Sequence, residues 1–229
     1  MANEIISYLE MCQREGTNLQ RGMNYGLGGT HSVILMSLRS NAPYRDRLDD
    51  DGSVLIYEGH DEPRRSLAQD PKKLDQPQFR PKGRLTQNGY FHGAAQSYKR
   101  GERLPERVRV YEKILSGVWS YNGVFHLVDS WQEPDEHRQV FKFKLIAVEG
   151  EEDLQQSTSP SAERRRIIPS AVKLAVWKRD EGKCVVCKAS DELHFDHVIP
   201  FSRGGTSVTA ENVQLLCTRH NLEKSNKIV

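Results

Sequence analysis

Four side chains near the end of the sequence form its clearest chemical pattern. They come in two pairs, Cys184 with Cys187 and Cys217 with His220, and two residues separate the members of each pair. Zn²⁺ prefers four sulfur or nitrogen ligands in a tetrahedron, and two such pairs supply them. The fourth cysteine of the chain, Cys12, lies far away in the sequence. We therefore predict a structural zinc site rather than disulfides, because three cysteines cannot pair evenly.

A second set of polar residues lies between and beside these pairs: Asp196, His197, Asn212, Asn221 and Lys224. Hydrolysis of a phosphodiester needs a general base for water and a cation that stabilises the pentavalent phosphate. A lone Asp-His pair is more often structural, but here Pro200 and two glycines follow it within the metal-binding segment. The pattern therefore indicates a metal-dependent nuclease centre.

Short secondary-structure elements are expected to position these residues. Alternating and apolar runs predict strands, and apolar residues at helical spacing predict helices. The expected elements are strands at 193–196 and 213–216, helices at 169–179 and 221–227, and a helix start at 209–212.

The expected helix at 169–179 carries Trp177, which we assign to the core rather than to DNA. Its basic residues Lys173, Lys178 and Arg179 either contact phosphates or form a solvated face.

Residues 168–227 resemble an HNH (ββα-metal) endonuclease domain of the zinc-stabilised type. The resemblance rests on FDHVIPFSRGG, which begins at Phe195, and on ENVQLLC, which begins at Glu211. It implies that His197 is the general base. It also implies that Asp196 and Asn221 hold a divalent metal ion, Mg²⁺ or Mn²⁺.

The same resemblance implies that Asn212 orients the base through its backbone. Two positions depart from the family pattern. His220 stands where the fourth zinc ligand is usually cysteine, and Asn221 stands where the last motif residue is often histidine.

The charge of the chain is unevenly distributed. From Arg164 onward there are 12 Lys and Arg against 7 Asp and Glu, and before it there are 21 against 24. A basic C-terminal third suits phosphate binding. No stretch is long and apolar enough to span a membrane. We expect a soluble protein of a reducing, prokaryotic cytoplasm.

The expected fold class is α+β, with a curved β-sheet or barrel followed by the ββα-metal domain and its zinc. A polar segment without apolar periodicity separates the two parts. The predicted division is 1–150 for the first domain, 151–166 for the linker and 167–229 for the nuclease domain. The expected elements before the linker are strands at 32–36, 53–57, 106–112, 123–129 and 140–148, and helices at 3–14 and 88–97, the latter with Asn88 as its cap.

The first part resembles an SRA (YDG) domain, the reader of modified cytosine. The stretches that carry the resemblance include THSVILMS from Thr30, TQNG from Thr86, RVRV from Arg107 and YNGVFHLVDSW from Tyr121. Asn122 replaces the aspartate of the Tyr-Asp-Gly signature. The resemblance implies that this domain flips a modified cytosine out of double-stranded DNA.

A flipped base must be stacked and bonded along its Watson–Crick edge. The resemblance assigns the stacking to Tyr44 and Tyr57. We choose Asp46 as the acceptor for the cytosine amino group, because carboxylates suit that donor. Asp49 is a rival, because the spacing from Tyr44 to Gly52 is one residue longer than usual. Tyr57 could instead belong to the core, and Asp49 to a solvated turn.

Together these resemblances predict a modification-dependent, type IV-like restriction endonuclease. It would read 5-methylcytosine or 5-hydroxymethylcytosine and cleave nearby, as a homodimer because one HNH site cuts one strand. Two alternatives remain open: a non-catalytic reader of modified DNA, and an HNH endonuclease that is indifferent to modification.

Overall fold

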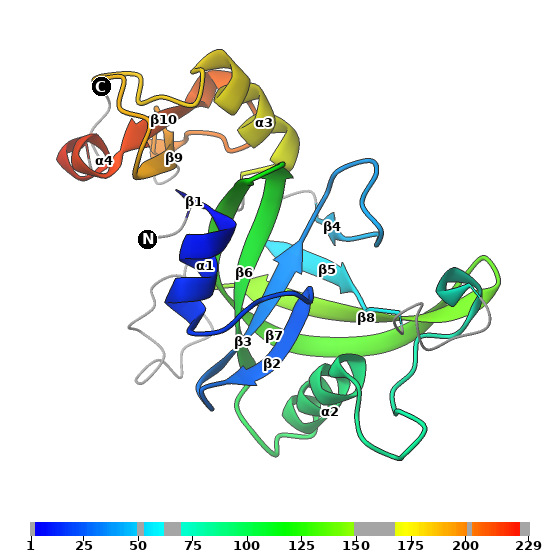
Figure 1. The fold of residues 1–229 in the computed structure, drawn as a ribbon. Coiled ribbons are helices and arrows are strands. Elements are labelled where there is room, and N and C mark those ends of the chain that lie inside the picture. Colours follow the sequence, from blue (N-terminus) through cyan, green and yellow to red (C-terminus); the bar gives the residue numbers. More distant parts are fainter. Residues whose placement is uncertain (1–2, 50–52, 62–69, 149–167, 201–202, 225–229) are drawn as a thin grey trace. The chain divides into compact units, whose positions relative to one another are not determined.

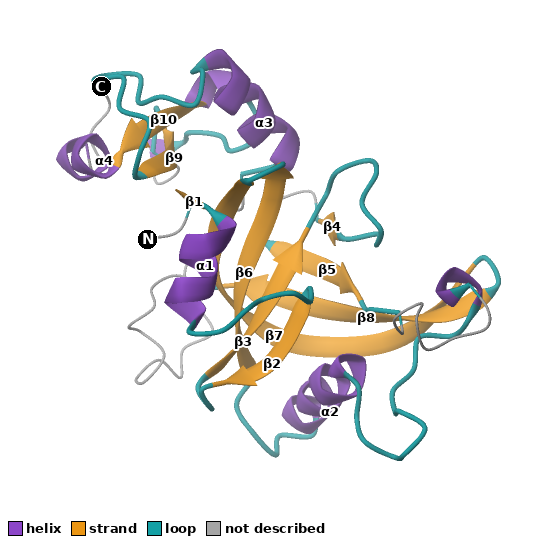
Figure 2. Ribbon diagram, in the orientation of Figure 1, coloured by secondary structure: helices purple, strands orange, loops and turns teal. Residues whose placement is uncertain are grey.

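The computed structural model describes residues 3–49, 53–61, 70–148, 168–200 and 203–224 (Figure 1). Helices and strands both contribute, so the expected α+β class is confirmed (Figure 2). The chain forms two compact units, and neither is continuous in sequence. The first unit comprises Met1–Asn18, Tyr111–Gly123 and Arg166–Val229, and the second comprises Leu19–Val110 and Val124–Arg165.

Two long strands contribute residues to both units: β6 (Glu106–Leu115) and β7 (Val118–Asp135). The linear division into 1–150, 151–166 and 167–229 stays a prediction about functional domains. The predicted linker, with its three arginines, lies outside the described residues.

The first unit contains three short strands that pair antiparallel with each other and with β7, in the order β10-β9-β1-β7. Three α-helices and one 3-10 helix accompany them. The elements are β1 (Glu4–Ile6), α1 (Tyr8–Glu15), α3 (Ser170–Arg179), β9 (Leu193–His197), η5 (Ala210–Asn212), β10 (Val213–Cys217) and α4 (Thr218–Lys224). The helix start expected at 209–212 is therefore a single 3-10 turn.

The prediction of one helix over residues 3–14 was wrong at its beginning. Ser7 and Glu10 form a capping box, in which each side chain binds the backbone N–H of the other residue. This box starts α1 at Tyr8 and leaves β1 as a strand. Gly16 ends the helix in the left-handed conformation, with φ of 63°.

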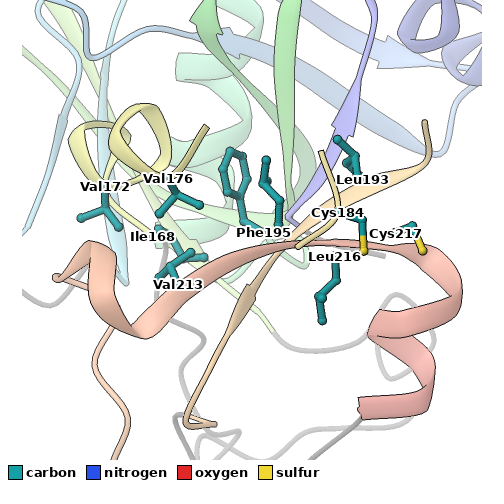
Figure 3. Close-up of a cluster of buried hydrophobic side chains, with 10 residues drawn as sticks. Ile168, Val172, Val176, Cys184, Leu193, Phe195, Val213, Leu216 and Cys217 are labelled. Carbon is teal, nitrogen blue, oxygen red and sulfur yellow. The ribbon is translucent and has the colours of Figure 1, made fainter. Parts of the chain in front are cut away.

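The core of the first unit lies between α3 and the β9–β10 hairpin (Figure 3). Val172 and Val176 of the helix pack with Phe195 and Val213 of the strands, and Cys184 belongs to the same cluster. Trp177 packs against this core, as predicted. The apolar contact fixes the helix on the hairpin that carries the nuclease residues.

A buried ion pair lies beside this core. Lys173 and Glu112 are both fully buried, and the ammonium Nζ lies 2.6 Å from the carboxylate Oε2. Lys173 also donates to Oδ1 of Asn122 at 2.7 Å, and Nδ2 of Asn122 donates to Glu112 at 3.0 Å. The hydroxyl of Ser170 donates to the same carboxylate. The expectation that Lys173 contacts phosphates or solvent was therefore wrong, because a buried charge must be paired.

The network also accounts for the altered signature at Asn122. Its amide both accepts from the ammonium and donates to the carboxylate, and the hydroxyl of Ser120 donates to its Oδ1 at 3.2 Å. An ionised aspartate could only accept, and it would stand beside Glu112 as a second buried negative charge.

The second unit is mostly β. Its pairs are antiparallel: β2 with β3, β4 with β5, β5 with β8, and β8 with β7. The strands are β2 (Met23–Leu27), β3 (His31–Met36), β4 (Arg47–Leu48), β5 (Val54–Glu58) and β8 (Arg138–Ala147). The strand runs expected from the sequence all fall on observed strands.

Helix α2 (Gln87–Lys99) packs on the second unit against β2 and β8. Its cap is Thr86, whose hydroxyl accepts from the N–H of Gly89 at 3.1 Å, so the prediction of Asn88 as cap was wrong. Asn88 instead binds the backbone of His60 through both its amide oxygen and its amide nitrogen. Within the described ranges, no helix combines the length and apolar character that crossing a membrane requires.

Replacement of Lys173 by methionine is expected to destabilise the first unit by about 3–5 kcal/mol, because it leaves Glu112 buried and uncompensated. Chemical denaturation of the purified protein measures this loss. Lys178→Met is the matched control, because Lys178 lies exposed on the same helix. Equal stability of the two variants would contradict the assigned role of the ion pair.

Candidate functional site

The four predicted metal ligands lie together in the first unit. Their ligand atoms are all within 4.8 Å of one another. Nδ1 of His220 lies 3.4 Å from Sγ of Cys184 and 3.3 Å from Sγ of Cys217. Sγ of Cys187 lies 3.8 Å from Sγ of Cys217. No disulfide joins the described cysteines, and Cys12 lies outside the cluster.

These separations fit one tetrahedral ion. Metal–sulfur bonds of about 2.3 Å imply sulfur–sulfur edges of about 3.8 Å in a tetrahedron. The first cysteine is also prepared to act as a thiolate. Burial works to raise the pKa of Cys184, but backbone N–H groups, including that of Cys187, lower it to about 6. The cluster could therefore hold a structural metal ion.

The end of strand β9 brings predicted nuclease residues together. Pairing with β10 sets His197 opposite Val213 and Asp196 opposite Gln214. Nε2 of His197 lies 2.9 Å from the hydroxyl of Ser207. A hydrogen bond at one imidazole nitrogen fixes the orientation of the ring.

The side chain of Asn212 fastens the loop that follows His197. Its Oδ1 accepts from the N–H of Ile199 at 2.8 Å, and its Nδ2 donates to the carbonyls of Ile199 and Thr206 at 3.1 and 2.9 Å. Its own carbonyl accepts from the N–H of Val198 at 2.8 Å. This nearly buried amide therefore determines the path of the backbone directly after His197.

The loop requires glycine at two consecutive positions, for a different physical reason at each. Gly204 has φ of 87°, which favours glycine. A Cβ on Gly205 would lie 1.8 Å from the carbonyl oxygen of Ile199 and 2.8 Å from Nδ2 of Asn212. Gly205 therefore allows the close approach on which the Asn212 contacts depend.

The carboxylate of Asp196 already binds a cation. Its Oδ2 lies 2.8 Å from Nζ of Lys224, and Nε2 of Gln214 donates to the same oxygen at 3.4 Å. Lys224 is nearly buried and also donates to the carbonyl of His197 at 2.5 Å. Helix α4 therefore reaches the end of β9 through this lysine.

Asn221 lies three residues before Lys224 on α4. Side chains three residues apart project from the same face of a helix. Because Lys224 contacts Asp196, the face that carries Asn221 is the one turned to the end of β9. The structure thus places the predicted ligand pair, Asp196 and Asn221, on neighbouring elements.

The predicted base pocket lies in the second unit, and a residue that the sequence did not indicate occupies its centre. The ring of His60 stacks on Tyr44, with centroids 4.4 Å apart and planes 9° apart. It lies 5.9 Å from the ring of Tyr57. The ammonium Nζ of Lys72 lies 4.2 Å from the ring centroid of Tyr44. Burial lowers the pKa of His60 to about 4, so the imidazole is neutral at pH 7.

Asp46 is held by main-chain donors. Its two carboxylate oxygens accept from the N–H groups of Ser37 and Glu58, each at 3.1 Å. Burial raises the pKa of Asp46 to about 7, although these two donors oppose the increase. A carboxyl group in this state can accept a hydrogen bond or donate one near neutral pH.

Tyr57 and Asp49 are engaged in the fold. Tyr57 is fully buried, and its hydroxyl lies 2.7 Å from Nε2 of His60 and contacts the carbonyls of Gly22 and Leu35. Asp49 is exposed and closes a turn, because both its backbone and its carboxylate bind Val54. Asp46 directly precedes β4, and it accepts from the N–H of Glu58, the residue after Tyr57.

A family model described as HNH endonuclease matches residues 184–227. The match includes the cluster of three cysteines and His220, the end of β9, the loop that the side chain of Asn212 holds, and α4. Residues 184–227 form an HNH endonuclease domain. The chain therefore carries a DNA endonuclease, and HNH endonucleases use divalent metal ions. No curated protein matches the chain.

Solved structures similar to the chain include SRA domains and a restriction enzyme. The SRA domain of SUVH5, in complex with hemimethylated CG DNA, is 23% identical over 66% of this chain and 89% of that chain, with a TM-score of 0.46. The modification-dependent TagI restriction endonuclease is 19% identical over 99% of this chain and 78% of that chain, with a TM-score of 0.43. SUVH6 of Arabidopsis thaliana is 19% identical over 86% of this chain and 31% of that chain, with a TM-score of 0.43.

Two residues beside the HNH and tyrosine sites were missed in the sequence. Ser207 and His60 gave no signal, because a serine or a histidine outside a motif has no distinctive spacing. Lys224 was already part of the sequence pattern, because it follows Asn221 by three residues, and it lies at the end of α4.

We expect the purified protein to contain one metal ion per chain in the cysteine cluster. Cys184→Ser should lose this ion, and the melting temperature of the first unit should fall by about 10 °C or more, because metal binding contributes to folding. Elemental analysis and thermal denaturation measure the two effects. Cys12→Ser is the matched control and should retain the ion. Retention of the metal by both variants would contradict the assignment.

Proposed function

We propose that this protein is a modification-dependent DNA endonuclease that reads 5-methylcytosine or 5-hydroxymethylcytosine and cleaves the DNA nearby. The observation that carries the proposal is the presence in one chain of an HNH endonuclease domain and of a second part with SRA-like motifs, which holds a partly buried carboxylate, Asp46, and the stacked rings of Tyr44 and His60.

The reading step would use the second unit. Tyr44 offers a ring face on which a planar group already stacks, since His60 lies parallel to it. A flipped cytosine would take the position between Tyr44 and Tyr57, and the side chain of His60 would have to move aside. Asp46 would accept from the cytosine amino group, because main-chain donors fix its orientation and carboxylates suit that donor.

The cleavage step would use the end of β9. His197 would take the proton from the attacking water, and the Ser207 hydroxyl beside Nε2 would hold the ring in place. Asn212 would keep the base in position by fixing the backbone of Ile199. The proposed roles of His197 and Asn212 both depend on contacts that the protein makes without DNA.

Two metal sites would support this chemistry. Asp196 and Asn221 would hold Mg²⁺ or Mn²⁺, which suits their oxygen donors and the affinity of Asp196 for a cation. The bound ion supplies stabilisation of the phosphate and the leaving oxygen. The cysteine cluster would hold Zn²⁺, because its three sulfurs and one nitrogen are a tetrahedral ligand set that structural zinc accepts.

A double-strand break requires two such centres. One HNH site cuts one strand, so we propose that the active form on double-stranded DNA is a homodimer or a pair of bound chains. Sedimentation of the protein with a modified duplex measures this stoichiometry.

The decisive experiment is a cleavage assay with Mg²⁺ or Mn²⁺ on one DNA sequence that carries cytosine, 5-methylcytosine or 5-hydroxymethylcytosine. Cutting of modified DNA alone is the expected result, and it identifies the mark. Equal cutting of all three duplexes would leave an endonuclease indifferent to modification. Selective binding without cutting would indicate a non-catalytic reader.

Replacement of His197 by alanine should lower the cleavage rate by at least about a hundredfold, because the general base is lost. Binding of modified DNA should stay within about twofold, as measured by fluorescence anisotropy. His137→Ala, which alters an exposed histidine, is the control and should cleave normally. Unimpaired cleavage by the His197 variant would exclude it as the base.

Replacement of Asp46 by asparagine should weaken binding of modified DNA by about tenfold or more, since a hydrogen bond to the cytosine edge contributes about 1–3 kcal/mol. Asp49→Asn removes the same charge at a turn and should bind normally. Anisotropy titrations with matched duplexes measure both. Weaker binding by the Asp49 variant alone would transfer the role to that residue.

A further inference from the structure

Lys224 places its ammonium group beside the carboxylate that is proposed to bind the divalent metal ion. Its ammonium group lies 2.8 Å from Oδ2 of Asp196, the carboxylate proposed to hold the divalent ion. The lysine is 6% exposed and the carboxylate side chain 19%, so solvent screens this pair only in part. Asp196 and the ammonium therefore interact strongly.

The same ammonium group makes a second contact with the nuclease centre. It donates to the main-chain carbonyl of His197 at 2.5 Å. One side chain of α4 thus binds a side chain and a backbone group of consecutive residues at the end of β9. This bridge restrains both the carboxylate and the backbone that carries the imidazole.

A divalent ion at Asp196 would lie a few ångströms from this ammonium. Like charges at about 4 Å repel strongly wherever the effective dielectric constant is well below that of water. The lysine therefore lowers the affinity of the carboxylate for the metal ion while it holds the carboxylate in place. These two effects can be measured separately. The lowered metal affinity depends on the charge of the lysine when metal is bound, whereas the carboxylate is held in place before the metal binds.

We propose that Lys224 is a positioning residue of the nuclease centre that holds Asp196 and His197 before metal binding and competes with the divalent ion for Asp196. The proposal rests on the proposed function of Asp196 as a metal ligand. It assigns to the lysine a restraint on metal affinity in addition to its support of the backbone.

The test measures Mn²⁺ affinity by calorimetry, without DNA, on the full-length protein with its cysteine cluster loaded. Lys224→Met should bind Mn²⁺ on the order of tenfold more tightly, because the competing charge is gone. Lys224→Arg keeps the charge and should stay close to the original affinity. Asn221→Ala removes a ligand and should bind more weakly. Unchanged or weaker binding by Lys224→Met would overturn the proposal.

Lys183→Met is the matched control for loss of a positive charge, because Lys183 is exposed on the same unit. It should leave Mn²⁺ affinity unchanged. An equal increase in this control would also overturn the proposal, since it would show a general charge effect.

Cleavage by Lys224→Met at saturating Mn²⁺ should fall by about tenfold, because the His197 carbonyl loses its donor.

A second measurement uses the unaltered protein, in case Lys224→Met does not fold. Amine-specific acetylation followed by mass spectrometry reports how readily each lysine reacts. Saturating Mn²⁺ should increase the reactivity of Lys224 severalfold and leave Lys183 unchanged. Constant reactivity of Lys224 would overturn the proposal. Failure of the proposed function differs in outcome, because it appears in the cleavage assay, as equal cutting of the three duplexes or as no cutting, and not in the Mn²⁺ affinities or lysine reactivities measured without DNA.

Discussion

The four-ligand cluster is the interaction on which the nuclease centre depends. It joins the turn at Cys184 and Cys187 to the junction between β10 and α4, where Cys217 ends the strand and His220 lies in the first turn of the helix. This junction leaves no loop residue between strand and helix. The cluster therefore sets the direction of α4, and with it the positions of Asn221 and Lys224.

The core alone would fix this arrangement less well. The apolar cluster of the first unit is small, and several of its members come from strands of five residues. Small domains bury too little apolar surface to be stable without further constraints, and a structural metal is a common one. Arg179 adds a polar constraint, since its guanidinium donates to the carbonyls of Ala210 and Val213 and so ties α3 to the start of β10.

Buried charges have a comparable role in the second unit. Glu58 lies 2.9 Å from the ammonium of Lys142, and Asp61 lies 2.5 Å from the guanidinium of Arg138. These pairs flank the segment that carries His60. Gln76 fastens the same segment by donating to the carbonyl of Gly59 at 2.6 Å. The proposed replacement of the His60 ring by a flipped base would benefit from a backbone that does not move, because only the side chain would then have to reorganise.

The sequence by itself determined the metal ligands, the strand end at Asp196 and His197, and most strands, because these features depend on local spacing and alternation. Only the tertiary structure decided which charged and polar side chains are buried and which partners they bind. Lys173 has the spacing of a surface residue, yet it is buried because Glu112, 61 residues away, supplies the compensating charge. Asn88 likewise has a distant partner, because it binds the backbone of His60, 28 residues away in the sequence. Such pairings depend on which strands become neighbours, and no local pattern encodes that.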